Sequence, residues 1–487
     1  MTTESPAKRN TTFKGDILRL VSGSALAQVI TLLSAPILTR LYGPEAYGIV
    51  ALFTSITGIV GVLACMRYEL SIVLPDSDRE AANLLVVSLM MSVLISSLTI
   101  PMIWYGGDQL LSWVNMPALA KYLWLIPLTV LINGIFTALN YWNTRTKHFT
   151  RLSVAKVSSQ VAGTGASLGL GFSGYANGGS LIIASLCGQA VATTVLLGQI
   201  LRDNGRFILG SITWLEMWNS VKRHRRFPLV SSWGALLNSA SWQIPILMLG
   251  AFFSPVIVGF YSLGFRLIQM PMSLIGGAIS QVFLQRGVES NNTGNLGRLV
   301  EELFNRMLII GLLPTMILMV IGADLFAFVF GSDWREAGVF TQILAPWAFV
   351  WFLSSPLSTI YVILEKQKKE LEVHVIIFFT RIIAITVGGM LGDARLAILL
   401  FSAGGIFAYG YLLRNIFFYA GLNGTYQLKK ILKNLTLGLV YIVPIFILHA
   451  IIEVEEYLVF IFSAVLLSYF YYKKKDHILQ LKGNINV

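Results

Sequence analysis

The fold of this chain is decided by residues 20–66, which read LVSGSALAQVITLLSAPILTRLYGPEAYGIVALFTSITGIVGVLACM. Only two side chains in this stretch are charged, Arg40 and Glu45, and both lie beside the turn at Gly43. The apolar segments before and after that turn are each long enough to cross the hydrocarbon core of a bilayer, which takes about 20 helical residues. The stretch therefore predicts two membrane-spanning helices joined by a tight turn.

The composition of the whole chain agrees with this stretch. Of the 487 residues, 55% are hydrophobic and 12% are charged, and the mean hydropathy is +0.71. Soluble globular proteins carry about 25% charged residues, so a soluble enzyme is excluded. The same hydrophobicity excludes a disordered chain. We therefore predict an all-α polytopic membrane protein.

Apolar segments of spanning length recur along the chain, and the fifth of them is the weakest because it is rich in Gly, Ser and Gln. The first 16 residues are polar, and no cleavable signal peptide is expected. The two cysteines, Cys65 and Cys187, lie in apolar runs and are expected to be buried. We expect about 14 transmembrane helices, near residues 18–39, 48–66, 84–105, 122–142, 153–172, 179–201, 230–252, 256–282, 303–327, 340–363, 373–391, 397–418, 435–452 and 457–472.

The net charge of +12 is distributed unevenly over the predicted loops. With the N-terminus placed in the cytoplasm, 30 of the 36 Lys and Arg residues fall in cytoplasmic segments. This asymmetry predicts that both termini are cytoplasmic, and it makes the charge a topology signal rather than a sign of nucleic-acid binding. Four basic residues fall on the opposite side and two fall within spans: Arg40, Lys121, Arg335 and Arg395, and then Arg266 and Arg381.

A short motif occurs twice in the sequence. Residues 44–52 and 255–263 both follow the pattern P-x3-G-x3-L with an offset of 211 residues, and Pro127 and Pro346 are a second pair, offset by 219. These offsets predict two copies of a six-helix unit, related by an axis along the membrane normal. The predicted organisation is an N-terminal six-helix lobe over 1–205, a cytoplasmic linker over 206–229, a C-terminal six-helix lobe over 230–420, and two extra transmembrane helices with a basic tail over 421–487.

The loop over 202–229 and the arginines within spans each allow two interpretations. The loop mixes basic with aromatic residues, so it is either a charged linker or an amphipathic segment on the inner leaflet. An arginine at the centre of a span costs about 2.5–3.5 kcal/mol on insertion scales. No Asp or Glu sits at mid-depth to pair with Arg266 or Arg381. These two either face a water-filled cavity suited to phosphate or snorkel to helix-end carbonyls.

Other polar and aromatic groups in the predicted spans have equally open roles. Arg40 and Arg67 bracket the second span. Arg40 can cap the first helix, and Arg67 can pair with Glu69. Scattered amides either hold helices together or bond sugar hydroxyls, and the in-span aromatic residues either stack on sugars or pack the core. The amides are Gln28, Asn133, Asn140, Gln160, Gln189, Asn238, Gln243, Gln269 and Gln281, and the aromatic residues are Tyr141, Trp142, Trp347, Trp351 and Tyr361.

A series of short motifs occurs along residues 12–425, and their order along the chain is more specific than any one of them. It comprises LTRLYGPEAYG at 38–48, RYE at 67–69 followed by IVLP at 72–75, Asp78 with AANL at 81–84, WNTR at 142–145 with Lys147 and Phe149, VGFY at 258–261 with Pro271, and Phe330-Gly331 with Trp334 and Ala337-Gly338. In this order the chain resembles the polysaccharide transport family of the multidrug/oligosaccharidyl-lipid/polysaccharide exporter superfamily.

The resemblance implies two six-helix lobes that alternate between inward-open and outward-open states in the bacterial inner membrane. It implies an oligosaccharide repeat unit on undecaprenyl diphosphate as cargo, for O-antigen, capsule or exopolysaccharide assembly. Membrane lipids, a polysaccharide polymerase and chain-length machinery are the implied partners, without a cofactor, a metal or a catalytic residue. Family members hold the anionic head with arginines, and Arg40, Arg67, Arg266 and Arg381 are the candidates here, although only the first two lie in matching motifs.

Three other functions remain open at this point. A cation-coupled drug exporter would need carboxylates in its cavity, and a membrane-embedded polymerase or glycosyltransferase would need a sizeable catalytic loop. The chain shows neither feature, and it has no GxxxxGK[ST] loop for direct use of ATP. A flippase for the peptidoglycan-precursor lipid would show the same physical features as the first hypothesis.

Overall fold

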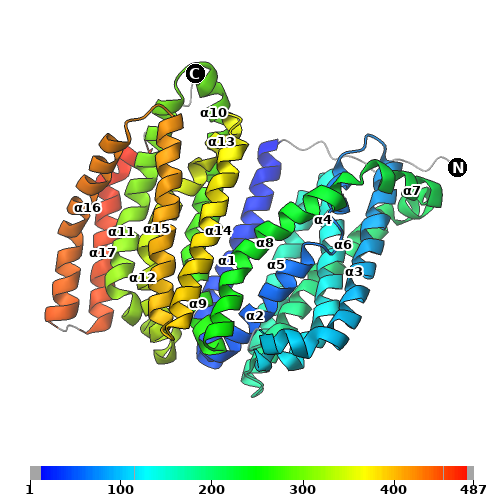
Figure 1. The fold of residues 1–487 in the computed structure, drawn as a ribbon, viewed down its shortest axis with the longest axis horizontal. Helices are drawn as coiled ribbons and strands as arrows, with labels where there is room; N and C mark the ends of the chain where they lie inside the picture. The colour runs from blue at the N-terminus through cyan, green and yellow to red at the C-terminus, as the bar shows by residue number, and fades with distance from the viewer. Residues whose placement is uncertain (1–12, 114–115, 453–454, 480–487) are drawn as a thin grey trace. The chain divides into compact units, whose positions relative to one another are not determined.

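The computed structural model describes residues 13–113, 116–452 and 455–479, and every regular element within them is a helix. The described residues form two compact units, divided between Gly259 and Phe260. Figure 1 shows their helices in chain order from blue to red. The four-part organisation expected from the sequence, with its linker at 206–229, remains a prediction.

The first unit is built mainly from long helices that pack side by side. α5 packs against both α1 and α6, α3 packs against α4, and α8 packs against α2. Its elements are α1 (Phe13–Leu41), α2 (Pro44–Gly61), η1 (Tyr68–Val73), α3 (Asp78–Trp113), η2 (Pro117–Leu125), α4 (Ile126–Arg145), α5 (Phe149–Phe172), α6 (Gly178–Ser211), α7 (Trp214–Arg223), η3 (Phe227–Ser231), α8 (Ser232–Phe252) and the first residues of α9 (Pro255–Pro271).

The second unit has a similar plan with two helices added. α12 packs between α11 and α15, α14 packs on α15, and the added helices α16 and α17 both pack on α11. The elements after α9 are η4 (Met272–Gly276), α10 (Gly277–Asn292), α11 (Leu296–Phe330), η5 (Ser332–Trp334), α12 (Arg335–Ser354), η6 (Ser355–Thr359), α13 (Ile360–Ile363), α14 (Gln367–Met390), α15 (Ala394–Tyr419), α16 (Gly424–Phe446), η7 (Ile447–Ile451) and α17 (Glu456–Leu479).

The predicted fold class is confirmed. Each of the 14 expected spans falls on a helix or on a helical rod made of consecutive elements. In the described part of the chain, 12 helices are long and apolar enough to cross a membrane. The two that fall short are α5, the weakest predicted span, and α17, whose apolar run ends in lysines.

The repeated motif is explained by a close contact within the first unit. A Cβ atom on Gly48 would lie 1.7 Å from the carbonyl oxygen of Pro255, and one on Gly259 would lie 1.9 Å from the carbonyl oxygen of Pro44. The first turns of α2 and α9 therefore cross with their backbones touching, and only glycine permits such an approach. The flanking helices keep the same offset of 211 residues, because α1 ends at Leu41 and α8 at Phe252.

Three π-helical turns interrupt the long helices near prolines. Pro228 lies within η3, Pro271 directly precedes η4, and Pro444 lies three residues before η7. Proline lacks a backbone N–H and its ring clashes with the carbonyl four residues earlier. Wider i→i+5 turns restore hydrogen bonding at such positions, and π-helical turns are frequent at functional sites.

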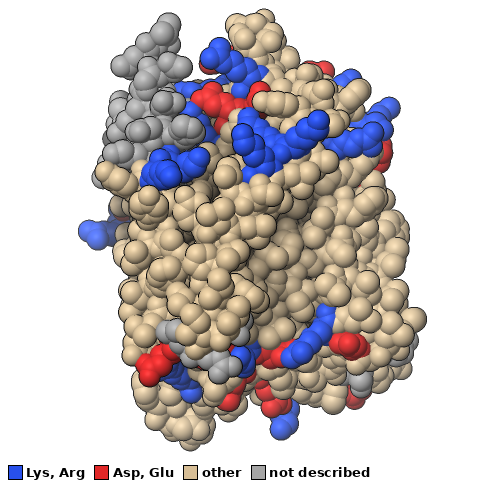
Figure 2. Space-filling view, turned by 90° about the vertical axis from the view of Figure 1, so that its left-hand side faces the viewer, with Lys and Arg blue, Asp and Glu red and all other residues tan. Residues whose placement is uncertain are grey.

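One face of the molecule carries few charged residues away from its ends (Figure 2). Figure 2 shows one face on which Lys and Arg gather toward one end, above a wide band of mostly uncharged residues. Cys65 is buried as expected, but the expectation for Cys187 is wrong, because this residue is exposed on α6. On a spanning helix, an apolar run contacts lipid as readily as protein, so apolar neighbours do not establish burial inside the protein.

Candidate functional site

Arg381 is held in an aromatic environment within the second unit. It lies on α14 with 5% of its surface exposed. Its Nη2 donates a hydrogen bond to the hydroxyl of Tyr409 on α15 at 3.1 Å, and its guanidinium carbon lies 6.0 Å from the ring centroid of Phe401. A hydrogen bond and a cation–π contact partly compensate the cost of burying the charge. Arg381 is thus a buried charge stabilised by its neighbours, and it is not accessible to a solute.

Stacked rings lie beside Tyr409 and Phe401, the two partners of Arg381. The rings of Trp347 and Trp351 on α12 lie 5.3 Å apart at 9°, and Phe265 on α9 stacks on both of them. Trp347 is fully buried and Trp351 nearly so. Trp142 and Tyr361 are buried as well, while Tyr141 is half-buried. Core packing therefore accounts for most of the aromatic residues considered as sugar platforms.

Arg266 has the opposite environment. It lies on α9 with its side chain exposed. None of the hydrogen bonds or ion pairs found among the described residues involves Arg266. It follows Pro255 by about 17 Å of helix, which is roughly half of a 30 Å hydrocarbon core. An exposed arginine at this depth is available to bind an anion.

Arg67 and Glu69 form a local ion pair on a segment whose backbone is strained. Arg67 has φ +62°, in the left-handed region that non-glycine residues rarely adopt, and Met66 before it has φ +48°. Arg67 Nη1 lies 3.5 Å from Glu69 Oε1, so the local ion pair considered from the sequence is present. Arg67 Nε and Glu69 Oε2 are buried without a hydrogen-bond partner among the described residues. Burial raises the pKa of Glu69, and a backbone hydrogen bond and Arg67 oppose this rise.

Arg40 lies exposed in the last turn of α1, directly before the crossing at Gly48. A cation in this position is favoured by the partial negative charge at the carboxyl end of a helix. This placement agrees with the capping role considered from the sequence. Arg40 and Arg67 belong to the first unit, and Arg266 and Arg381 belong to the second.

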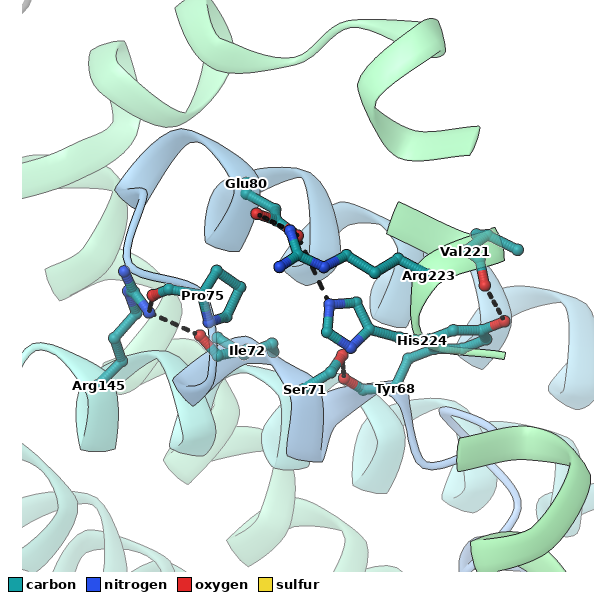
Figure 3. Close-up of polar contacts among 9 residues, drawn as sticks. All are labelled: Tyr68, Ser71, Ile72, Pro75, Glu80, Arg145, Val221, Arg223 and His224. Atoms are coloured by element: carbon teal, nitrogen blue, oxygen red, sulfur yellow. Dashed lines mark hydrogen bonds and ion pairs between the residues drawn. The ribbon is translucent and has the colours of Figure 1, made fainter. Parts of the chain in front are cut away.

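The segment that carries Arg67 and Glu69 is fixed by a clamp that the sequence did not reveal. At the end of α4, Arg145 donates through Nη1 to the carbonyls of Ile72 at 3.1 Å and Pro75 at 2.6 Å, as Figure 3 shows. Its Nη2 also binds Asp78 at 2.8 Å. The interactions join α4 to both ends of the connector between η1 and α3. The sequence motif WNTR shows that residue 145 is a positive charge, but it does not show which groups accept hydrogen bonds from it.

A second set of contacts joins α7 and the residue after it to η1 and α3, the elements on either side of the same connector. Arg223 Nη1 lies 3.1 Å and His224 Nε2 lies 3.5 Å from Glu80 Oε1, and the hydroxyl of Tyr68 donates to the carbonyl of Val221 at 3.4 Å (Figure 3). α7 packs on α3 through this side, with Met217 buried. Its other side exposes Trp214 and Leu215, and both interpretations of the 202–229 loop stay predictions.

The structure separates amides that looked alike in the sequence. Gln243 on α8 accepts a hydrogen bond from Ser55 on α2 at 3.0 Å and therefore joins two helices. Asn238, Gln269 and Gln281 are exposed. Gln269 lies one turn after Arg266 on α9, and this proximity could have been found from the spacing.

Two apolar cavities lie in the second unit. One of about 740 Å³ is bounded by α11, α12, α15 and α16, and Arg414 is the only charged residue that lines it. Another of about 510 Å³ lies among α9, α11 and α12. Within the described ranges, no group of His, Cys, Asp and Glu side chains could hold a metal ion.

A comparison with models of known protein families identifies the family of this chain. A family model described as "Polysaccharide biosynthesis protein" matches residues 37–339, which is more than half of the chain. No curated protein sequence matches significantly. These results agree with the resemblance stated from the motifs.

Solved structures show the same fold at low sequence identity. The chain is similar to the lipid II flippase MurJ in an inward closed conformation, with 13% identity, coverage of 95% of this chain and 100% of that chain, and a TM-score of 0.73. It is also similar to an inward-facing multidrug resistance transporter of the MATE family in the MOP superfamily, with 17% identity, coverage of 83% and 98%, and a TM-score of 0.60. At these identities the likeness establishes the fold alone.

Proposed function

This chain belongs to the family of polysaccharide biosynthesis proteins, and from that premise we propose that it is a flippase for lipid-linked oligosaccharides. It moves repeat units carried on undecaprenyl diphosphate from the cytoplasmic to the outer face of the bacterial inner membrane, by alternating access and with both termini in the cytoplasm. The units then enter O-antigen, capsule or exopolysaccharide assembly, where a polymerase and chain-length machinery act on them. The protein itself is not an enzyme in this proposal.

The observation that carries the proposal is the exposed side chain of Arg266, which lies eleven residues after Pro255, the first residue of a helical rod long and apolar enough to cross a membrane. A charge at that depth is sustained by water or by a ligand of opposite charge. The diphosphate of the cargo is such a ligand, and arginine binds phosphate oxygens through two parallel hydrogen bonds. We assign direct binding of the diphosphate to Arg266.

The other three candidates act less directly in this proposal. Arg381 adds positive potential without touching the cargo, because it is nearly buried and its Nη2 donates to Tyr409. Arg67 reaches the cargo only when its pair with Glu69 opens. Arg40 attracts the anionic head near the end of α1. The apolar cavities of the second unit suit the polyisoprenyl chain, since burial of apolar groups is favourable.

The acidic residues near the spans argue against a cation-coupled drug exporter. Glu69 is paired with Arg67. Asp324 on α11 is paired with Arg335, and its Oδ2 lies 2.9 Å from His449 Nε2. Each of the two carboxylates is therefore already paired with an arginine. A peptidoglycan-precursor lipid offers the same diphosphate, so the two flippase functions must be separated by experiment.

The test uses a bacterial strain that lacks this protein. We would label lipid-linked sugars radioactively and measure on which membrane face the complete units accumulate. Accumulation on the cytoplasmic face, cleared by the wild-type protein but not by Arg266→Ala, supports the proposal. Arg395→Ala is the matched control, because Arg395 is an exposed arginine paired with Glu336 at 2.7 Å. If the units reach the outer face without the protein, the proposed function is wrong. If the accumulated lipid is the peptidoglycan precursor, the alternative flippase function is correct.

A further inference from the structure

The rod formed by α9, η4 and α10 carries a line of exposed polar side chains within the second unit. Arg266, Gln269, Ser273 and Gln281 are exposed, whereas Tyr261 and Phe283 on the same rod are buried. The spacings of three and four residues place the first three on one face of the helix. We call these four residues the polar stripe.

The π-helical turn η4 lies inside the polar stripe, and it includes Ser273 and ends before Gln281. In a regular α-helix these two residues would be rotated by about 80° from each other, since each residue advances about 100°. A π-helical turn holds an extra residue and reduces this rotation. The turn therefore keeps Gln281 closer to the face that carries Arg266 and Gln269.

Lipid is an unsuitable neighbour for this face. An amide without a hydrogen-bond partner in hydrocarbon costs several kcal/mol, so polar side chains on spanning helices face protein or water. No hydrogen bond among the described residues involves the side chain of Gln269 or Gln281, and Ser273 donates only to the carbonyl of Met270 at 2.9 Å. The two amides thus keep their full capacity to bind a solute.

The chemistry of the polar stripe indicates what that solute is. A glutamine side chain offers two donors and one acceptor without a net charge. Neutral sugars present hydroxyl groups that both donate and accept, so they match neutral amides better than they match carboxylates or ammonium groups. Only Arg266 in the polar stripe is charged, and it lies one helical turn from Gln269. An anion bound at Arg266 would therefore place an attached glycan against the amides.

We propose that Gln269 and Gln281, with Ser273 between them, are glycan-contact residues that bind neutral sugars of the cargo while Arg266 binds its diphosphate. This inference rests on the proposed function, and it identifies the residues of the same site that contact the sugar. Each amide hydrogen bond is expected to change affinity by about three- to tenfold.

The experiment measures binding by the full-length protein in lipid nanodiscs. The two probes are the lipid-linked sugar units extracted from the deletion strain and undecaprenyl diphosphate without sugar. We expect the wild-type protein to bind the extracted units at least tenfold more tightly. Gln269→Leu and Gln281→Leu should each lower affinity for the extracted units about three- to tenfold and leave affinity for undecaprenyl diphosphate unchanged. Arg266→Gln should weaken both.

The matched control is Gln109→Leu, which removes an exposed amide on α3 in the first unit. Equal affinity of the wild-type protein for the two probes overturns the glycan contact while leaving the flippase proposal intact. Loss of both probes together with a lower thermal midpoint in Gln269→Leu shows a structural role and also overturns it. If the wild-type protein binds neither probe, the proposed function itself fails.

Discussion

The crossing of α2 and α9 makes a strong prediction about Gly48 and Gly259. An alanine Cβ at Gly48 would lie 1.7 Å from the oxygen and 2.5 Å from the carbon of the Pro255 carbonyl. At Gly259 the corresponding distances to the Pro44 carbonyl are 1.9 and 2.7 Å. Because Cβ atoms essentially never approach other atoms within 3.0 Å, the two backbones must move apart by about 1.3 Å to admit Gly48→Ala.

The cost of each substitution follows from this displacement. Overpacking a well-packed contact costs about 1–3 kcal/mol, and here the obstacle is backbone that cannot change its rotamer. We therefore expect Gly48→Ala and Gly259→Ala each to destabilise the protein by about 2 kcal/mol or more. The same separation of the helices relieves both clashes. The double variant should consequently lose less stability than the sum of the two single variants.

The assay is thermal unfolding of the purified full-length protein, followed by its loss of monodisperse elution. Gly61→Ala is the control, because it lies in the same helix and a Cβ there meets nothing within 4 Å. If Gly48→Ala unfolds at the same temperature as Gly61→Ala, the proposed backbone crossing is wrong. If the effects of Gly48→Ala and Gly259→Ala add in full, the two contacts are independent and the shared crossing is refuted.

Three further predictions concern other contacts. Arg145→Lys should destabilise the protein by about 1–3 kcal/mol, because lysine cannot reproduce the fork that binds two carbonyls and a carboxylate, and thermal unfolding measures this. Burial raises the pKa of Glu69 in the folded protein above its value in the unfolded chain. Between these two pKa values the folded state binds more protons than the unfolded state, so the free energy of unfolding of the wild-type protein falls as pH rises through this window. Glu69→Gln should therefore gain in thermal midpoint relative to wild type over this window, whereas a pH-independent difference would contradict the assignment. Trp347→Ala removes a fully buried ring and should cost about 3–5 kcal/mol in chemical denaturation, while the same change at exposed Trp214 should cost far less.

The spans could be predicted from the sequence because the bilayer imposes a length and a polarity on each of them. Prediction of spans from length and hydropathy fails first where a helix is polar or contains few apolar residues. α5, over 149–172, contains many Gly and Ser residues, and it is stabilised by packing between α1 and α6 rather than by its own hydropathy. Such support depends on neighbours far away in the chain, which a hydropathy pattern does not describe.

The site could be predicted only in part, because a charge in a sequence does not show its partner. Arg266 and Arg381 both appeared as uncompensated charges within spans. The structure leaves Arg266 exposed but gives Arg381 a hydroxyl 28 residues away, on Tyr409. Nothing in the spacing of these two residues signals the contact, since it depends on how α14 packs against α15.

The repeat also indicates where the two copies have diverged. With the offset of 211 residues, Arg266 corresponds to Ser55 and Gln269 corresponds to Gly58. In the first unit, Gln243 on α8 accepts a hydrogen bond from Ser55 and lies 3.2 Å from where a Cβ on Gly58 would be, so small residues are needed there. In the second unit, the corresponding face of α9 is exposed and carries the larger polar side chains. The residues that the two copies share maintain the helix crossing, and the residues that differ between them are those to which we assign the cargo.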